Sequence, residues 1–148
     1  MLLVEDNPVD SIFIEKALRG SACADEIHCV ATGEEALEFL VERTTHPTES
    51  TPLPKLIILD VKLPRMSGFE FLQTIRSQSR YKDVSIVVFS GTESEFDRKM
   101  ALDLGANGFV LKPFNMANFS CAVEEIAKGC FGSFTIEAPP PSAVVSYP

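Results

Sequence analysis

Short apolar runs and periodic apolar residues alternate along the chain, and this pattern predicts five strands that are each followed by a helix. Almost continuous apolar runs bounded by turn residues are typical of strands covered on both faces of a sheet. Between the runs, apolar residues recur three or four positions apart, which is the spacing of one helix face. The alternation predicts a parallel sheet with helices on both faces, the doubly wound α/β class. The predicted strands are residues 2–4, 26–30, 56–59, 84–89 and 108–111.

The ends of the predicted helices carry local signals. Asn7 and Pro8 suit the cap and the first residue of a helix that ends at Gly20. Thr32 and Glu35 have the spacing of a capping box at the start of the second helix. The apolar faces of the helices are, in chain order, Val9, Ile12, Phe13 and Ala17; Leu37, Leu40 and Val41; Phe69, Leu72 and Ile75; Phe96, Met100 and Leu104; and Phe119, Val123, Ile126 and Cys130.

Two segments fall outside this pattern. Residues 44–55 form a polar, proline-containing loop that is long for a connection between a helix and a strand. The residues from about 133 onward contain too much proline to extend the last helix, and they predict an extended or disordered terminus. With 148 residues, the chain is expected to form one domain over residues 1–131 and a proline-rich tail over residues 132–148.

Composition narrows the classes of partner. With 45% apolar and 23% charged residues, the chain is typical of a soluble globular protein. The formal net charge of −8 argues against a nucleic-acid partner bound through its phosphates, and it is compatible with a cation site. The sequence has no signal peptide and no apolar run near the ~20 residues of a membrane helix, so no membrane partner is expected.

Cysteine and histidine form no recognisable metal-binding pattern. None of the four cysteines has the Cys-x-x-Cys spacing, which predicts reduced thiols in a cytoplasmic protein. Cys29 and Cys121 are expected to fill space in the core. His28 and His46 belong to no cluster of ligands, which argues against a zinc site.

Chemically active side chains follow four of the five predicted strands. In an open α/β sheet, ligands bind outside the carboxyl ends of the strands. Two carboxylates ~5 Å apart repel each other by ~3 kcal/mol at an effective dielectric constant near 20, so either one of them stays protonated or a cation lies between them. A site made only of oxygen ligands suits Mg²⁺. The residues at these strand ends are Glu5, Asp6, Asp60, Ser90 and Lys112.

These residue types together indicate phosphoryl transfer. Lys112 can hold an incoming anion, Ser90 can donate a hydrogen bond to it, and Gly91 leaves room for it to enter. Phosphoryl transfer depends on positioning and charge neutralisation, which carboxylates, a divalent metal and a lysine supply. Asp60 is the candidate nucleophile, and its attack on phosphorus would form an aspartyl phosphate.

Four motifs occur in a specific order: LLVEDNP, LIILDVKLPRMSG, VVFSG and GFVLKPF. With them, residues 1–131 resemble the receiver domain of bacterial two-component response regulators. The resemblance implies a flavodoxin-like sheet with strand order 2-1-3-4-5. The long loop at 44–55, and the end of the chain soon after the receiver, resemble the small regulators that pair with phytochrome-like histidine kinases.

The resemblance also implies roles for individual residues. Asp60 matches the phosphoacceptor, which takes its phosphoryl group from a kinase phosphohistidine, and Lys112 matches the lysine that binds the phosphoryl group. Asp6, Asp60 and the backbone carbonyl of Lys62 would ligate Mg²⁺, while Glu5 would act on the metal through water. The protein would thus be a phosphoprotein that signals and catalyses its own phosphoryl transfer and dephosphorylation, rather than an enzyme acting on other substrates.

The family's conformational switch maps onto further residues. Ser90 matches the switch hydroxyl, and Phe109 matches the aromatic switch residue, although Phe109 lacks a hydroxyl and could be held inward only by packing. The peptide bond between Lys112 and Pro113 matches one that is cis in the family. The family's output face comprises the fourth helix, fifth strand and fifth helix, through which a homodimer is expected. The first strand begins at Met1 and is shorter than usual for the family, so residues before it are expected to be missing.

Other functions account for fewer of these residues. A dehalogenase-type phosphatase needs a second aspartate two residues after its nucleophile, where this chain has Lys62. A flavodoxin-like FMN carrier needs a glycine- and hydroxyl-rich loop after the first strand, where this chain has EDNPVD. A receiver-like interaction module that signals without phosphorylation remains the alternative.

Overall fold

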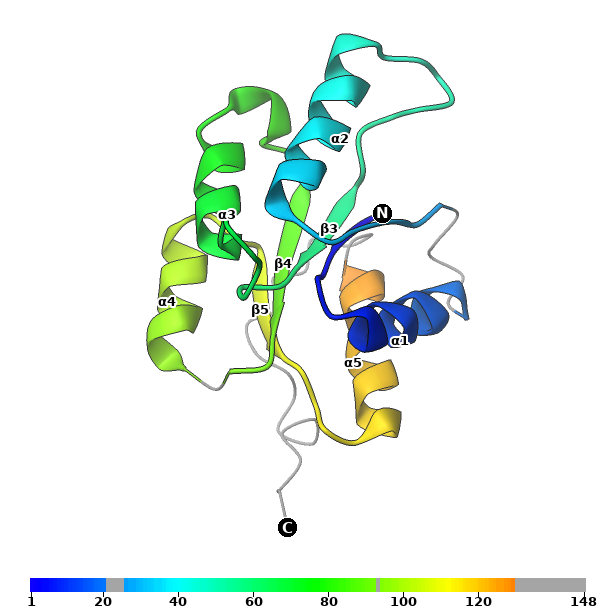
Figure 1. Ribbon diagram of the computed structural model, residues 1–148, viewed down its shortest axis with the longest axis vertical. Helices are drawn as coiled ribbons and strands as arrows, with labels where there is room; N and C mark the ends of the chain where they lie inside the picture. Colours follow the sequence, from blue (N-terminus) through cyan, green and yellow to red (C-terminus); the bar gives the residue numbers. More distant parts are fainter. Residues whose placement is uncertain (21–25, 93, 130–148) are drawn as a thin grey trace.

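Five parallel strands form the central sheet, in the order β2-β1-β3-β4-β5 (Figure 1). The computed structural model describes residues 1–20, 26–92 and 94–129, and the predicted tail and Cys130 lie outside these ranges. Both the predicted fold class and the predicted strand order are confirmed. The strands are β1 (Leu2–Val4), β2 (His28–Val30), β3 (Leu56–Leu59), β4 (Ser85–Ser90) and β5 (Gly108–Leu111).

Helices cover both faces of the sheet. α1 and α5 pack against each other on one face, while α2, α3 and α4 lie on the other (Figure 1). Successive residues of β3 serve opposite layers: Leu56 and Ile58 belong to the core under α1 and α5, and Ile57 and Leu59 to the core under the other three helices. The helices are α1 (Pro8–Arg19), α2 (Gly33–Thr45), α3 (Gly68–Arg76), α4 (Glu95–Asp103) and α5 (Met116–Gly129), with a 3₁₀ turn at Ser79–Tyr81.

The exposed face of α1 differs from the sequence prediction. Val9 and Ile12 are 57% and 62% exposed, whereas Ile14 and Leu18 are fully buried. Ala17 is the member of the predicted face that is buried. Two stripes with helical spacing run along this helix, and contact with the sheet and α5 selects the one that contains Ile14 and Leu18.

Four further expectations about exposure are wrong. Val41 of α2 is 46% exposed, although it was expected on the apolar face of that helix. Phe96 of α4 is 70% exposed, because the small residue Ala101 makes the buried contact of that helix instead. Cys29 and Cys121 are exposed rather than buried in the core, and Cys29 lies on β2, the strand at one edge of the sheet. Among the described residues, no helix combines the length and apolar character needed to cross a membrane.

Side-chain caps fix where the helices begin. Oδ1 of Asn7 accepts hydrogen bonds from the backbone N–H groups of Val9 and Asp10, as expected for an N-cap. Thr32 caps α2, but the carboxylate of Glu35 accepts from Ala31 rather than Thr32, so the predicted capping box is only half formed.

A complete capping box occurs instead at the start of α3. Oγ of Ser67 accepts from the backbone N–H of Glu70, while the Glu70 carboxylate accepts from the backbone N–H of Ser67. This cap fixes the first turn of α3 directly after the loop that follows β3.

Candidate functional site

The register of β1 and β3 brings three carboxylates to the same edge of the sheet. Val4 pairs with Leu59, so Glu5 and Asp60 emerge side by side, and the backbone N–H of Asp60 donates to the carbonyl of Val4 over 3.0 Å. One carboxylate oxygen from each of Glu5, Asp6 and Asp60 lies within 4.8 Å of the other two. Glu5 and Asp60 are buried and Asp6 is exposed. The predicted acidic cluster is therefore present.

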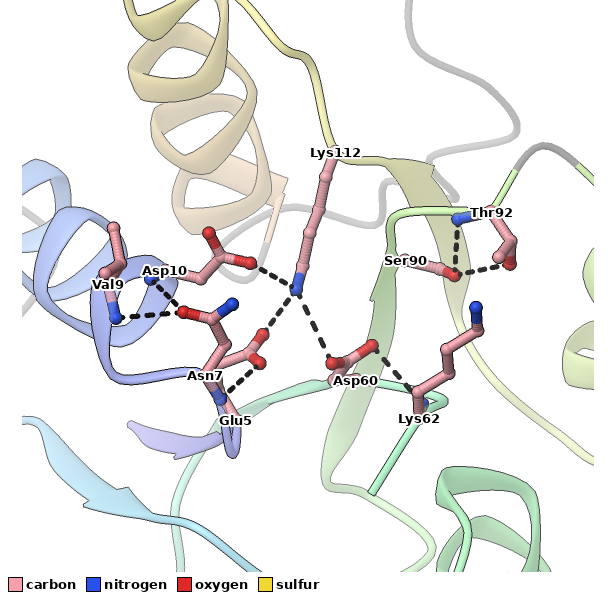
Figure 2. A network of polar contacts seen from close by, with 9 residues as sticks. All are labelled: Glu5, Asn7, Val9, Asp10, Asp60, Lys62, Ser90, Thr92 and Lys112. Atoms are coloured by element: carbon pink, nitrogen blue, oxygen red, sulfur yellow. Dashed lines mark hydrogen bonds and ion pairs between the residues drawn. The ribbon is translucent and has the colours of Figure 1, made fainter. Parts of the chain in front are cut away.

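Lys112 reaches this cluster from the end of β5. Its Nζ donates hydrogen bonds to Oε2 of Glu5 at 2.5 Å and to Oδ2 of Asp10 at 3.0 Å, and it lies 3.5 Å from Oδ2 of Asp60 (Figure 2). The side chain is 11% exposed, so these ion pairs are only weakly screened by water. The structure thus joins β1, α1, β3 and β5 through one ammonium group.

Asp10 is a site residue that the sequence analysis did not single out. It lies in the first turn of α1, where an acidic residue ordinarily needs no explanation beyond the helix dipole. The available signal was its position one helical turn after Asp6, close to the strand end that carries the other acids. Its contact with Lys112 spans 102 positions of sequence, which no local pattern reveals.

Burial and neighbouring charges shift the pKa of Glu5 and of Lys112. Burial raises the pKa of Glu5 to about 7, and the neighbouring charge of Asp60 adds to this effect, although the hydrogen bond from Lys112 opposes it. Burial alone would lower the pKa of Lys112, but its hydrogen bond to Glu5 and the charge of Asp60 raise that pKa on balance. The ammonium of Lys112 therefore stays charged.

This donor set fits a divalent cation. The clustered ligand atoms are all carboxylate oxygens, which hard cations such as Mg²⁺ prefer. The three carboxylates of the cluster also outnumber the single charge of Lys112, whose ammonium contacts Glu5 and Asp60. Lys62 lies beside the cluster, with its backbone N–H 3.4 Å from Oδ1 of Asp60 and its side chain exposed.

Ser90 lies at the end of β4, next to the strand that carries Asp60, and its side chain is buried (Figure 2). Oγ of Ser90 and Oγ1 of Thr92 are 3.0 Å apart, and the Thr92 hydroxyl donates to Oδ2 of Asp97 over 3.2 Å. Because the Thr92 proton is directed to Asp97, the Ser90 hydroxyl is the donor in the Ser90–Thr92 pair. Ser90 is thereby connected to α4 through two residues that the sequence analysis did not identify.

The loop after β3 packs tightly against the residue that carries the central carboxylate. A Cβ atom at Gly68 would lie 2.3 Å from the backbone oxygen of Asp60 and 2.9 Å from Cα of Val61. The backbone N–H of Gly68 also donates to the carbonyl of Val61 at 2.9 Å. Glycine therefore allows α3 to begin directly against the end of β3.

Two features near Lys112 bear on the predicted switch. Phe109 is buried in the core shared with α4 and α3. The expected cis bond between Lys112 and Pro113 is wrong for this structure, in which the described residues contain no cis peptide. The trans form is the intrinsically favoured isomer before proline, and from it Lys112 already reaches Glu5 and Asp10.

Comparison with known proteins places this geometry in a family. Residues 1–124 match the model of the response regulator receiver domain. Response regulator Rcp1 of Synechocystis is 29% identical over 138 residues, which cover 93% of this chain and 92% of Rcp1. A probable methanogenesis regulatory protein, FilR2 of Methanothrix harundinacea, is 29% identical over 132 residues, which cover 89% of this chain and 83% of that protein.

Solved structures show the same relationship. The Mn²⁺-bound form of Rcp1 superposes with a TM-score of 0.78 at 29% identity, covering 90% of this chain and 95% of that one. The phosphorylated cyanobacterial phytochrome response regulator RcpA gives a TM-score of 0.78 at 32% identity, covering 90% and 94%. With its sheet order, its acidic cluster and its matching family model, the chain belongs to the response regulator receiver domain family.

Proposed function

We propose that the protein is a single-domain response regulator that accepts a phosphoryl group on Asp60 from the phosphohistidine of a histidine kinase. The observation that carries this proposal is the geometry at Asp60: a buried carboxylate at a strand end, clustered with Glu5 and Asp6, with Nζ of Lys112 3.5 Å away. Residues 1–131 would form the receiver, and residues 132–148 would form a proline-rich tail.

Mg²⁺ is the metal that we propose for the site. Asp6, Asp60 and the backbone carbonyl of Lys62 would hold it, and Glu5 would contact it through water. When bound, the metal would neutralise charge on the carboxylates and on the phosphoryl oxygens. The donor chemistry of the cluster supports this assignment, and the Mn²⁺-bound form of the relative Rcp1 is consistent with a divalent ion.

The chain's own residues then have defined tasks. An oxygen of the Asp60 carboxylate attacks phosphorus, the bond between phosphorus and the histidine nitrogen breaks, and the histidine leaves with that electron pair. Lys112 binds an oxygen of the transferred group and compensates its charge. Hydrolysis of the acyl phosphate by water later restores the free carboxylate, so the protein would end its own signal.

Ser90 would carry the signal away from the site. Donating its hydroxyl proton to the phosphoryl group would break its hydrogen bond to Thr92, and Thr92 is hydrogen-bonded to Asp97 of α4. Phe109 is already buried, so it would follow this change by packing alone. The face formed by α4, β5 and α5 would then change its affinity for a partner or for a second copy of the chain.

A phytochrome-like histidine kinase in the cytoplasm is the partner that we propose. The chain resembles RcpA over 94% of the length of RcpA, which is a phytochrome response regulator. Another similar structure, at 32% identity and a TM-score of 0.68, is the bacteriophytochrome response regulator AtBRR. A phosphotransfer profile against purified phytochrome-like and unrelated kinases would identify the cognate kinase by its faster transfer.

Acetyl phosphate with Mg²⁺ tests the proposed function directly. We expect the mass of one phosphoryl group to be gained, in a form that alkali removes, and to be lost in Asp60→Asn. Asp83→Asn serves as a matched control because Asp83 is exposed and lies outside the acidic cluster. Labelling that persists in Asp60→Asn would overturn the assignment. An unlabelled parent that still binds a kinase would favour the phosphorylation-independent interaction module.

A further inference from the structure

The ammonium of Lys112 is held most closely by two carboxylates other than that of Asp60. Nζ lies 2.5 Å from Glu5 and 3.0 Å from Asp10, but 3.5 Å from Asp60. Figure 2 shows the ammonium between Asp10 on α1 and Asp60 beyond β3. The distance to Asp60 exceeds that of a good charge-assisted hydrogen bond. Lys112 is therefore displaced toward β1 and α1.

Asp10 is firmly positioned to hold the lysine there. Its backbone N–H donates to Oδ1 of Asn7, the residue that caps α1, which fixes the first turn of this helix. Its side chain is 29% exposed, so its ion pair with Lys112 is partly shielded from water. A helix dipole alone would not require this carboxylate to point inward at an ammonium.

We infer that Asp10 is a positioning residue that restrains Lys112 in the unphosphorylated protein and competes with the incoming phosphoryl group for its ammonium. This inference rests on the proposed phosphorylation of Asp60. The ammonium has three N–H donors, and Glu5 and Asp10 already occupy two of them. The negative charge of Asp10 also weakens the attraction of Lys112 for an anion at Asp60.

Removing the charge of Asp10 should speed the labelling of Asp60 but weaken the binding of the metal ion. In Asp10→Asn, Lys112 is freer to meet the phosphoryl group, and we expect labelling of Asp60 by acetyl phosphate to be faster by about tenfold. The same change removes negative charge near the cation site, so Mn²⁺, measured by electron paramagnetic resonance, should bind more weakly. Mere structural damage would instead reduce both labelling and metal binding.

Three further variants isolate the mechanism. Glu15→Gln removes the same charge from the same helix, but Glu15 contacts Arg19 rather than Lys112, so neither measurement should change. Asp10→Glu keeps the negative charge, so Asp60 of this variant should be labelled nearly as slowly as in the parent. In a Lys112→Gln background, Asp10→Asn should no longer accelerate labelling, because the restrained group is absent.

The outcomes separate this inference from the proposed function. If the parent is not labelled at Asp60, the proposed function fails. The restraint is then decided by the ¹⁵N resonance of the Lys112 ammonium in metal-free protein, which should shift and broaden in Asp10→Asn. If the parent is labelled but Asp10→Asn is labelled no faster, the inference is overturned. It is also overturned if Asp10→Asn accelerates labelling as much in the Lys112→Gln background as in the parent. An unchanged Lys112 resonance would overturn it as well.

Discussion

Nη2 of Arg76, the last residue of α3, donates a 2.9 Å hydrogen bond to Oδ1 of Asn107, which immediately precedes β5. The same oxygen of Asn107 accepts from the backbone N–H of Ile86, and the backbone N–H of Asn107 donates to the carbonyl of Ile86. Arg76 also donates to the carbonyls of Tyr81 and Val84. This network ties the end of α3 to β4 and to the residues that precede β4 and β5, and no local sequence pattern predicts it.

Arg76→Ala should therefore destabilise the protein substantially. The substitution removes the guanidinium donor from the partly buried carbonyls of Tyr81 and Val84. Among the described residues, only the carbonyl of Tyr81 keeps a second donor, the backbone N–H of Val84, and we expect a loss of about 2–3 kcal/mol in the free energy of unfolding. Urea denaturation measures this loss. Arg80→Ala is the control, since Arg80 is exposed, its guanidinium hydrogen bonds go to the side chain of Gln78, and it otherwise lies 4.9 Å over the ring of Tyr81; a change below about 1 kcal/mol is expected. Equal effects of the two substitutions would contradict the structural role of Arg76.

Tyr81→Phe should leave the stability unchanged or raise it. The ring of Tyr81 is fully buried, and its hydroxyl has no hydrogen-bond partner among the described residues. Removing an unsatisfied buried hydroxyl relieves a desolvation cost of about 1 kcal/mol, while the ring keeps its packing. Thermal denaturation of the two proteins provides the comparison. A clear loss of stability would mean that the hydroxyl makes a hydrogen bond in solution.

Gly68→Ala should damage both the fold and the candidate site. The added Cβ would lie 2.3 Å from the backbone oxygen of Asp60, so the end of β3 and the start of α3 must separate. A loss of stability of about 1–3 kcal/mol and slower labelling of Asp60 are expected. Gly20→Ala is the control, because a Cβ there lies far from the candidate site and makes only ordinary contacts, at 3.5 and 3.7 Å, with the backbone oxygens of Ala17 and Lys16. Full labelling of Gly68→Ala would show that the close approach is unimportant.

The contribution of Glu5 to the stability of the metal-free protein should fall as the pH rises from about 4.5 to about 7. Burial raises the pKa of Glu5 from 4.5 to about 7, so between these values the folded protein keeps a proton that the unfolded chain has released. Raising the pH then favours unfolding. The test compares the unfolding free energies of the parent and Glu5→Gln in the presence of a chelator. Relative to Glu5→Gln, the parent should become less stable as the pH rises across this range. A difference that does not depend on pH would contradict the raised pKa.

Lys62→Ala should shorten the lifetime of the aspartyl phosphate. The exposed side chain of Lys62 lies two residues beyond Asp60, where it can shield the phosphoryl group from water and compensate its charge. The decay of alkali-labile label after removal of acetyl phosphate measures the lifetime. Lys82→Ala, an exposed lysine before β4, is the control. Unchanged decay in Lys62→Ala would refute this role.

Local patterns in the sequence were sufficient to predict the architecture and the central residues of the site. Apolar runs located all five strands to within two residues at either end, because a strand covered on both faces must be apolar throughout. The alternation with helices makes the strands parallel, and this brings their carboxyl ends to one edge. Glu5, Asp6, Asp60 and Lys112 each follow a strand directly, so their convergence could be inferred without coordinates.

Other features were decided only by the tertiary structure. Four features were not predicted from the sequence: the buried stripe of α1, the network around Arg76, the link from Ser90 to α4, and the pairing of Asp10 with Lys112. Each depends on which residue of one element faces which residue of another, and these pairs are separated by up to 102 positions in the chain. Hydrophobic periodicity predicts the secondary structure of the segment in which a residue lies. A contact between two segments depends instead on how the sheet and helices pack and on which charges they bring together.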